Sequence, residues 1–137
     1  MLAAEDFLRP WRLERRLDDR LAGRTGRLEG VLRVLAEPDG LRLEEEGWLH
    51  WGDGPPLPAR AAWLWRWEGG EVAVAFADGR AFHRFRPAGL VRGTEHCCGA
   101  DLYRVRYDFR AWPVWRTEWT AHGPRKDYRL ESVHRPA

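Results

Sequence analysis

At 137 residues the chain has the size of one domain and is long enough to bury a core without disulfide support. Its 23 basic and 21 acidic residues nearly balance, and arginines alternate with acidic residues instead of forming a patch, which argues against a nucleic-acid partner. No stretch approaches the roughly 18 apolar residues of a membrane span, so we expect no membrane association.

Two features of the chain favour a cytoplasmic location. The N-terminal stretch 1–11 carries two acidic residues and no long apolar run, so it does not resemble a signal peptide. The only cysteines, Cys97 and Cys98, are adjacent and cannot cross-link distant segments, so we expect free thiols in a reducing compartment. The sequence carries no signal for an oligomeric state.

The predicted elements are short β-strands, because apolar residues recur with period two along most of the chain. Residues 2–8 are expected to form a helical turn that ends before Pro10. We expect a loop at 47–58, with room for a short strand at Trp48–Trp51, and less regular structure at 87–100. The predicted strands are, in chain order, 11–17, 27–34, 41–45, 63–67, 72–76, 80–86, 101–110, 115–121 and 126–134.

Strands at this spacing, each with one apolar face, require either a sandwich or a barrel. The connections are short and sequential, and polar residues occur on the inner faces, which a dry sandwich core would reject. We therefore predict a mostly β fold over residues 1–137, a single antiparallel barrel of about 8–10 strands. It is similar to lipocalins and fatty-acid-binding proteins, although Arg9-Pro10-Trp11 replaces the lipocalin Gly-x-Trp.

Five signatures together resemble an uncharacterised bacterial family, a domain of unknown function. They are Phe7-Leu8-x-Pro10-Trp11-Arg12-Leu13-Glu14-Arg15, Leu41-x-Leu43-x-Glu45-x-Gly47, Asp78-Gly79-Arg80-x-Phe82-His83, His96-Cys97 followed by Asp101-x-Tyr103-x-x-x-Tyr107-x-Phe109, and Gly123-Pro124-x-Lys126-x-Tyr128. The resemblance spans nearly the whole chain. It implies the family label and a barrel, and it brings no activity to carry over.

The hairpin turn at Asp78-Gly79 sets the inner face of the middle strands. With these two as loop residues, Phe76 faces Ala81 and Val74 faces His83, so His83 shares the apolar face that we take as inner. If the other face of these strands is the inner one, Phe82 points inward instead. A shift of one residue in the strand pairing would also exchange the two faces.

The same alternation turns Arg15 and Glu45 inward, on strands 11–17 and 41–45. A buried charge is costly unless it is paired, so one interpretation is an ion pair that fixes the register of the strands. In the other, the planar guanidinium of Arg15 receives an anionic group of a ligand, because it suits a carboxylate or a phosphate.

Further polar and aromatic residues on the inner faces predict a pocket for one small ligand. Tyrosines and His83 would supply hydrogen bonds, tryptophans would stack on the ligand, and Lys126 would sit at the barrel mouth. His96-Cys97-Cys98-x-x-Asp101 matches no standard zinc spacing, so we expect no metal, and no motif names a cofactor. The candidate ligand-binding residues are Arg15, Glu45, Trp65, His83, His96, Asp101, Tyr103, Tyr107, Trp119 and Lys126.

The sequence leaves three functions open. The first is binding of a small polar, aromatic or anionic metabolite in the pocket. The second is an enzyme with His83 as acid or base, oriented by Asp101 or Glu45, which requires a His83–carboxylate hydrogen bond beside an open cavity. In the third, tryptophans fill the cavity, and exposed Trp48 and Trp51 form a contact surface for another protein.

Overall fold

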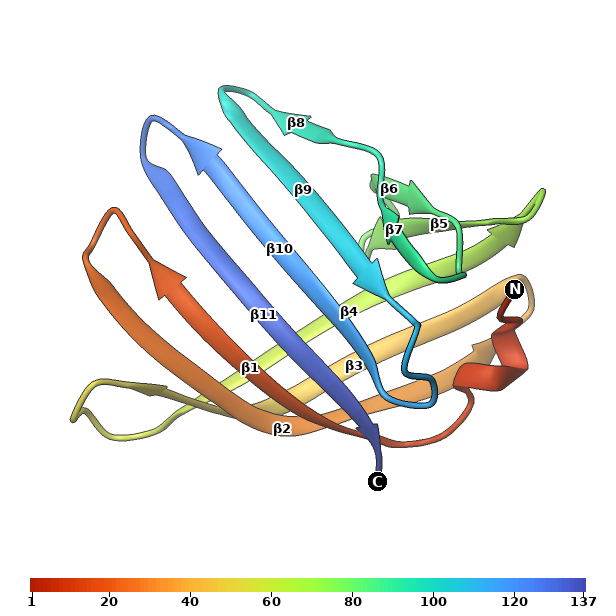
Figure 1. The fold of residues 1–137 in the computed structure, drawn as a ribbon, viewed down its shortest axis with the longest axis horizontal. Coiled ribbons are helices and arrows are strands. Elements are labelled where there is room, and N and C mark those ends of the chain that lie inside the picture. The colour runs from red at the N-terminus through yellow and green to blue at the C-terminus, as the bar shows by residue number, and fades with distance from the viewer.

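The alternation of apolar and polar residues produces the predicted antiparallel barrel in the computed structural model, which describes residues 1–137 (Figure 1). Ten strands are hydrogen-bonded in the order β6-β5-β4-β3-β2-β1-β11-β10-β9-β7, and β8 pairs with β9 beside this path. The elements are η1 (Ala4–Phe7), β1 (Trp11–Asp19), β2 (Arg24–Glu37), β3 (Gly40–Trp51), β4 (Leu57–Glu68), β5 (Glu71–Phe76), β6 (Ala81–Phe85), β7 (Leu90–Arg92), β8 (His96–Cys98), β9 (Asp101–Asp108), β10 (Trp115–Gly123) and β11 (Lys126–Pro136).

The barrel is nearly closed, because the two terminal strands of this order, β6 and β7, do not pair with each other. The segment after β7 bridges the seam: Thr94 N donates to Arg84 O, and Arg84 N donates to Thr94 Oγ1 (both 2.9 Å). On the other side, Gly93 N donates to Val105 O (2.8 Å). A few hydrogen bonds of residues 93–94 thus complete the wall between β6 and β9.

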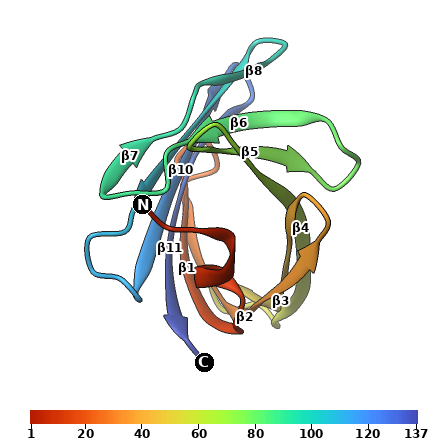
Figure 2. The ribbon, with the colours of Figure 1, turned by 90° about the vertical axis from the view of Figure 1, so that its right-hand side faces the viewer.

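The 3-10 turn η1 lies across one end of the barrel (Figure 2). Its Phe7 is fully buried, and Trp11 Nε1 donates a hydrogen bond to the Phe7 carbonyl (3.1 Å). Aromatic rings surround Phe7 with centroids 5.0–6.5 Å away, and they belong to Trp11, Trp65, Trp67, Phe109, Trp112 and Trp115. This end is therefore plugged by packed core.

No helix in the chain is long and apolar enough to cross a membrane.

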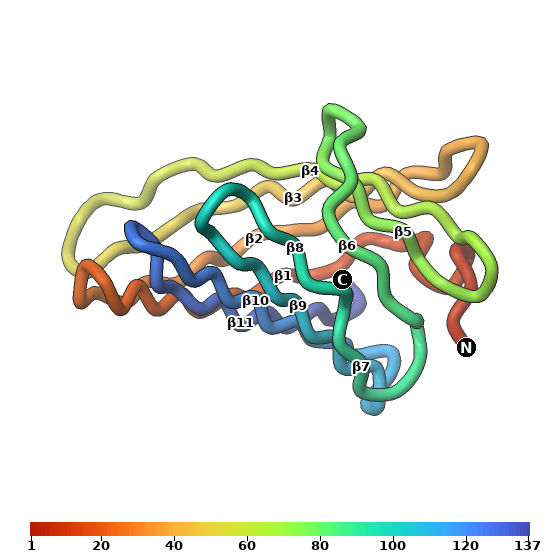
Figure 3. Tube along the Cα trace, turned by 90° about the horizontal axis from the view of Figure 1, so that it is seen from above, coloured from red at the N-terminus to blue at the C-terminus, as the bar shows by residue number.

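The opposite end of the barrel is formed by hairpins that diverge. The β3–β4 turn lies apart from the β10–β11 and β8–β9 turns, both in Figure 1 and when seen from above in Figure 3. Strands β2, β3 and β4 are 14, 12 and 12 residues long, whereas β5 and β6 have 6 and 5, so one wall extends beyond the other. The two ends of the barrel thus differ: one is plugged and the other is splayed.

The loop predicted at 47–58 is mostly wrong. Strand β3 continues to Trp51 and β4 begins at Leu57, so only residues 52–56 turn. The strand persists through Gly47 because Gly47 pairs with Gly30 on one side and with Ala59 on the other, and these residues need little room. The stretch 87–100, expected to be less regular, contains the short strands β7 and β8.

The register predicted for the β5–β6 hairpin is half right. Val74 pairs with His83 as expected, but Ala81 pairs with Ala75 instead of Phe76, because a bulge interrupts the ladder. A bulge inserts one extra residue and re-aims its side chain. Consequently the neighbours Phe82 and His83 are both buried, each 4% exposed, and neither alternative register alone describes this strand.

Candidate functional site

The interior holds one ion pair, between Arg15 of β1 and Glu45 of β3. Arg15 Nη1 donates to Glu45 Oε1 (2.8 Å) and Nη2 donates to Oε2 (2.6 Å), while Nε donates to Ser132 Oγ (2.7 Å). The pair is mostly buried, and this two-pronged geometry is the strong form of an arginine–carboxylate contact. The predicted inward direction of both residues is confirmed, and so is their mutual pairing.

A small cavity of about 40 Å³ adjoins this ion pair. Trp115 lines it, and its Nε1–H has no hydrogen-bond partner although the atom is buried. His134 lies flat against Trp115, with ring centroids 3.7 Å apart, and its Nδ1 donates to Trp115 O (3.2 Å). The lining residues are Arg15, Leu32, Leu43, Glu45, Trp63, Trp65, Val74, Tyr107, Trp115, Thr117, Trp119 and His134.

Towards the splayed end, the inward-facing side chains are only half-buried. Trp63 of β4 and Trp119 of β10 lie edge to face with centroids 5.5 Å apart, and both line the cavity while remaining partly exposed. Beyond them the inner face of β2–β4 carries small residues, since Gly30 pairs with Gly47 and Gly47 pairs with Ala59. Trp63 and Trp119 are thus partly exposed members of the cavity lining.

His83 lies outside this cavity, in the seam between β6 and β9. Its Nε2 shares a hydrogen bond with Tyr107 Oη (2.6 Å), and its buried Nδ1 has no partner. Burial lowers the pKa of His83 to about 3, with a smaller contribution from His96, and burial raises the pKa of Tyr107. The carboxylate that the enzyme hypothesis requires beside His83 is absent, because Glu45 binds Arg15 and Asp101 lies near Lys126.

A second polar group lies at the mouth of the splayed end. Lys126 Nζ donates to Tyr103 Oη (2.6 Å) and lies 3.6 Å from Asp101 Oδ2. The hydrogen bond to Tyr103 raises the pKa of Lys126, so the ammonium stays charged. His96 packs edge-on against Phe82 nearby (5.3 Å between centroids). Asp101 and Tyr103 were predicted to share one pocket with Arg15, but with Lys126, expected at the barrel mouth, they form a separate rim.

The ten candidate residues thus divide into three places. The cavity is lined by Arg15, Glu45, Trp65, Tyr107 and Trp119. The rim holds His96, Asp101, Tyr103 and Lys126, and His83 lies in the seam. Ser132 and His134 of the last strand were missed, although they alternate with Glu131 and Val133 and so share one face.

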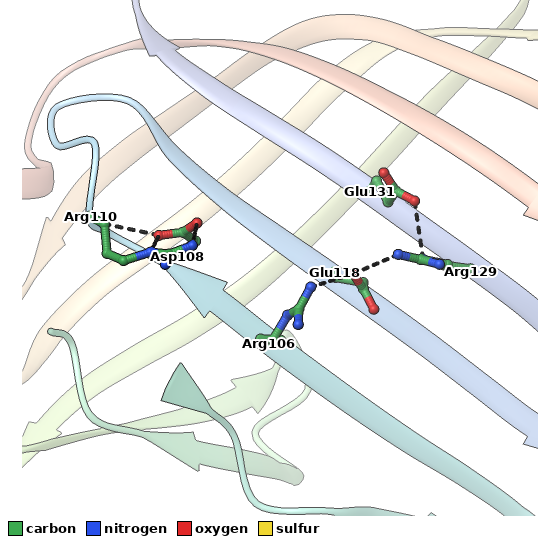
Figure 4. Close-up of polar contacts among 6 residues, drawn as sticks. All are labelled: Arg106, Asp108, Arg110, Glu118, Arg129 and Glu131. Atoms are coloured by element: carbon green, nitrogen blue, oxygen red, sulfur yellow. Dashed lines mark hydrogen bonds and ion pairs between the residues drawn. The ribbon is translucent and has the colours of Figure 1, made fainter. Parts of the chain in front are cut away.

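The outer face of β9–β11 carries paired charges instead of a basic patch (Figure 4). Glu118 accepts hydrogen bonds from Arg106 and Arg129 (both 2.9 Å), and Asp108 binds Arg110. Grooves of about 280 and 560 Å³ on this face exceed the internal cavity in volume, but charged side chains dominate their lining. Exposed ion pairs of this kind are an ordinary solvated surface, so we place the candidate site inside the barrel.

The thiols and the tryptophans at the end of β3 were further candidates for functional side chains. Cys97 and Cys98 are both exposed and free, and no group of three or more His, Cys, Asp or Glu residues is placed to hold a metal ion. Trp48 is 55% exposed on the outer face, whereas the ring of Trp51 is covered by the Arg24 guanidinium (4.4 Å). A contact surface built on both tryptophans therefore reduces to Trp48 alone.

This plugged, nearly closed antiparallel barrel has a lipocalin-like fold. Residues 7–136 match the model of the Family of unknown function (DUF6314), so the chain belongs to this family. No curated protein matches it.

Two solved structures are similar in fold. The S-type phycobiliprotein lyase CPES from Guillardia theta superposes with a TM-score of 0.68 at 12% identity, covering 97% of this chain and 89% of the lyase chain. A protein with unknown function from the DUF3598 family of Nostoc punctiforme PCC 73102 gives 0.62 at 12% identity, covering 98% of this chain and 48% of that one. At such identity the likeness concerns the fold alone.

Proposed function

We propose that the protein binds a small aromatic molecule in the splayed half of its barrel. The observation that carries the proposal is the pair Trp63–Trp119, two inward aromatic rings that line the cavity yet remain partly exposed. Inward side chains in a filled barrel would be buried, as they are at the plugged end around Phe7. Aromatic rings beside a few polar groups are the usual lining of a small-molecule site.

The room for such a ligand lies above the cavity and not within it. A volume of about 40 Å³ holds a few atoms, whereas pockets for whole ligands measure roughly 300 Å³ or more. We place the ligand at the splayed end, between the β3–β4 wall and the rim at Lys126, where the inner face carries the small residues Gly30, Gly47 and Ala59. The ligand would stack on Trp63 and Trp119 and point one end down toward Arg15.

The fold comparison supports the proposal at a coarse level. Of the two similar structures, the one with the higher TM-score is an S-type phycobiliprotein lyase, which favours a small-molecule site in a barrel of this shape. The contacts of Arg15 weigh against the anionic metabolite that was one expectation, because Glu45 already occupies the guanidinium. The enzyme alternative lacks the carboxylate partner that His83 would need.

The experiment is a fluorescence titration with N-phenyl-1-naphthylamine, a neutral aromatic probe whose emission rises in an apolar site. Trp63→Ala and Trp119→Ala should each weaken binding about tenfold, which corresponds to about 1.4 kcal/mol. Trp48→Ala is the matched control, since it removes an exposed tryptophan from the outer face and should leave binding unchanged. No binding by the native protein, or equal binding by all three variants, would contradict the proposal.

A further inference from the structure

We infer that the cavity beside Arg15 and Glu45 receives a neutral hydrogen-bond acceptor, a carbonyl group, carried at the inner end of the aromatic ligand. This inference rests on the proposed function and names the chemical class of its ligand. It follows from three properties of the cavity: its charge, its unpaired donor and its size.

The charge of the cavity is already balanced. Arg15 and Glu45 are the only charged residues that line it, and they neutralise each other through two hydrogen bonds of 2.8 and 2.6 Å. His134 adds no charge, because burial lowers its pKa to about 3, with a further lowering from Arg15. An anion entering this space would lose its hydration and face the Glu45 carboxylate without an unpaired cation to meet it.

One residue of the cavity lining, Trp115, carries a donor that lacks a partner. Trp115 is 1% exposed and lines the cavity, and its Nε1–H has no hydrogen-bond partner. An indole nitrogen donates and does not accept, so only an acceptor can satisfy it. Thr117, also in the lining and paired across the ladders with Tyr107 and Ser132, supplies a hydroxyl as a second donor.

The size of the cavity selects a small group. One water molecule needs about 10–15 Å³ of cavity volume, so a cavity of about 40 Å³ admits only a few non-hydrogen atoms. A carbonyl and its neighbouring carbon fit this space, while the ring to which they are attached remains between Trp63 and Trp119. A leftover buried donor is costly, so a carbonyl that pairs with it should bind more tightly than an alkyl group of the same shape.

The test uses three naphthalenes that share a 2-dimethylamino group and differ at position 6. One carries a propionyl group, the second a propyl group and the third a carboxylate. Fluorescence titration of the native protein should give a dissociation constant at least fivefold lower for the propionyl compound than for either of the others. Equal affinity for propionyl and propyl, or tightest binding of the carboxylate, would overturn the inference.

Two variants test whether the preference for the propionyl compound arises in the cavity. Thr117→Val removes the hydroxyl at nearly constant shape, and Trp115→Phe removes the indole N–H; either should reduce the propionyl preference to about twofold or less. Thr120→Val is the matched control, because Thr120 lies on the same strand and lines an outer groove, and it should retain the full preference. Trp115 is central to the core, so Thr117→Val replaces Trp115→Phe as the deciding variant if Trp115→Phe fails to fold. An unchanged propionyl preference in Thr117→Val contradicts the inference.

The outcome also separates this inference from the proposed function. If all three naphthalenes and N-phenyl-1-naphthylamine fail to bind, the proposed function fails and the inference fails with it. If they bind with equal affinity and depend on Trp63 and Trp119, the aromatic site stands and the carbonyl assignment alone is wrong.

Discussion

Arg15 and Glu45 bind each other over the inner face of β2, although β1 and β3, which carry them, do not pair. Arg15 lies opposite Leu28 of β2 and Glu45 lies opposite Leu32, so Gly30 falls between them. Because glycine has no side chain, the guanidinium reaches the carboxylate directly above the strand. One ion pair thus couples three neighbouring strands at the floor of the candidate site.

Breaking this pair on one side should destabilise the protein strongly. Glu45→Gln leaves the Arg15 charge mostly buried without its counter-ion, and we expect a loss of about 3 kcal/mol in the free energy of unfolding, measured with urea. The double variant Arg15→Met with Glu45→Leu removes both charges, so it should be more stable than Glu45→Gln. A double variant less stable than Glu45→Gln would show that the stability loss in Glu45→Gln comes mainly from the lost ion pair and not from the unpaired charge of Arg15.

Gly30→Ala should be costly for a steric reason. A Cβ at position 30 would lie 2.2 Å from Glu46 O and 2.7 Å from Gly47 Cα, which are backbone atoms of β3 that cannot rotate away. We expect a loss of about 1–3 kcal/mol in urea unfolding. Gly54→Ala is the control, since its nearest atom would be 3.3 Å away, and it should change stability by less than about 0.5 kcal/mol. Similar losses in both variants would mean that the close approach of β2 and β3 is unimportant.

Phe7 should account for much of the stability of the plugged end. Phe7→Ala removes a fully buried ring from a cluster of aromatic side chains, and we expect a loss of about 3–5 kcal/mol in the free energy of unfolding. Leu8→Ala changes the adjacent residue, which is 44% exposed, and should cost about 0.5 kcal/mol or less. If Phe7→Ala unfolds at the same urea concentration as the native protein, η1 does not plug the barrel.

Acid should unfold the protein through its buried histidines. The pKa values of His83 and His134 are lowered to about 3 by burial, whereas an exposed histidine titrates near 6.5. Between these values the unfolded chain binds protons that the folded chain does not, so stability falls as the pH drops from about 6.5 toward 3.

Each of these histidines should contribute a slope of up to about 1.4 kcal/mol per pH unit. His134→Phe keeps a flat ring against Trp115 and should flatten the dependence of urea unfolding on pH by about that amount. His122→Gln changes an exposed histidine of β10 and should leave the slope as it is. An unaltered slope in His134→Phe would show that buried His134 does not contribute to the pH dependence of stability.

The sequence predicts this fold well where one face of a strand is apolar and the other charged. Arg15 and Glu45 could be assigned to the interior because their strands alternate without interruption. The bulge at Phe82 could not be foreseen, since it depends on how β6 packs against His96 and Trp119. The strands β7 and β8 were missed because each has 3 residues and owes its pairing to β9.

The candidate site was predictable only in part, because alternation reports a face and not a depth along the barrel. Tyr103 and Tyr107 share one face of β9, yet Tyr103 binds Lys126 at the rim whereas Tyr107 lines the cavity. Partners across the barrel are equally hidden, and so the sequence could not show that His83 meets Tyr107 instead of the carboxylate that the enzyme hypothesis requires. The position of each strand along the barrel axis requires the three-dimensional structure.

The most direct test of aromatic binding at the splayed end uses the protein's own nine tryptophans. Their indole N–H signals can be followed by ¹H–¹⁵N correlation NMR while N-phenyl-1-naphthylamine is added to the native protein. We expect the signals of Trp63 and Trp119 to shift most and that of exposed Trp48 to stay in place. Shifts confined to Trp48 would instead place the contact on the outer face of β3 and contradict a ligand site inside the barrel.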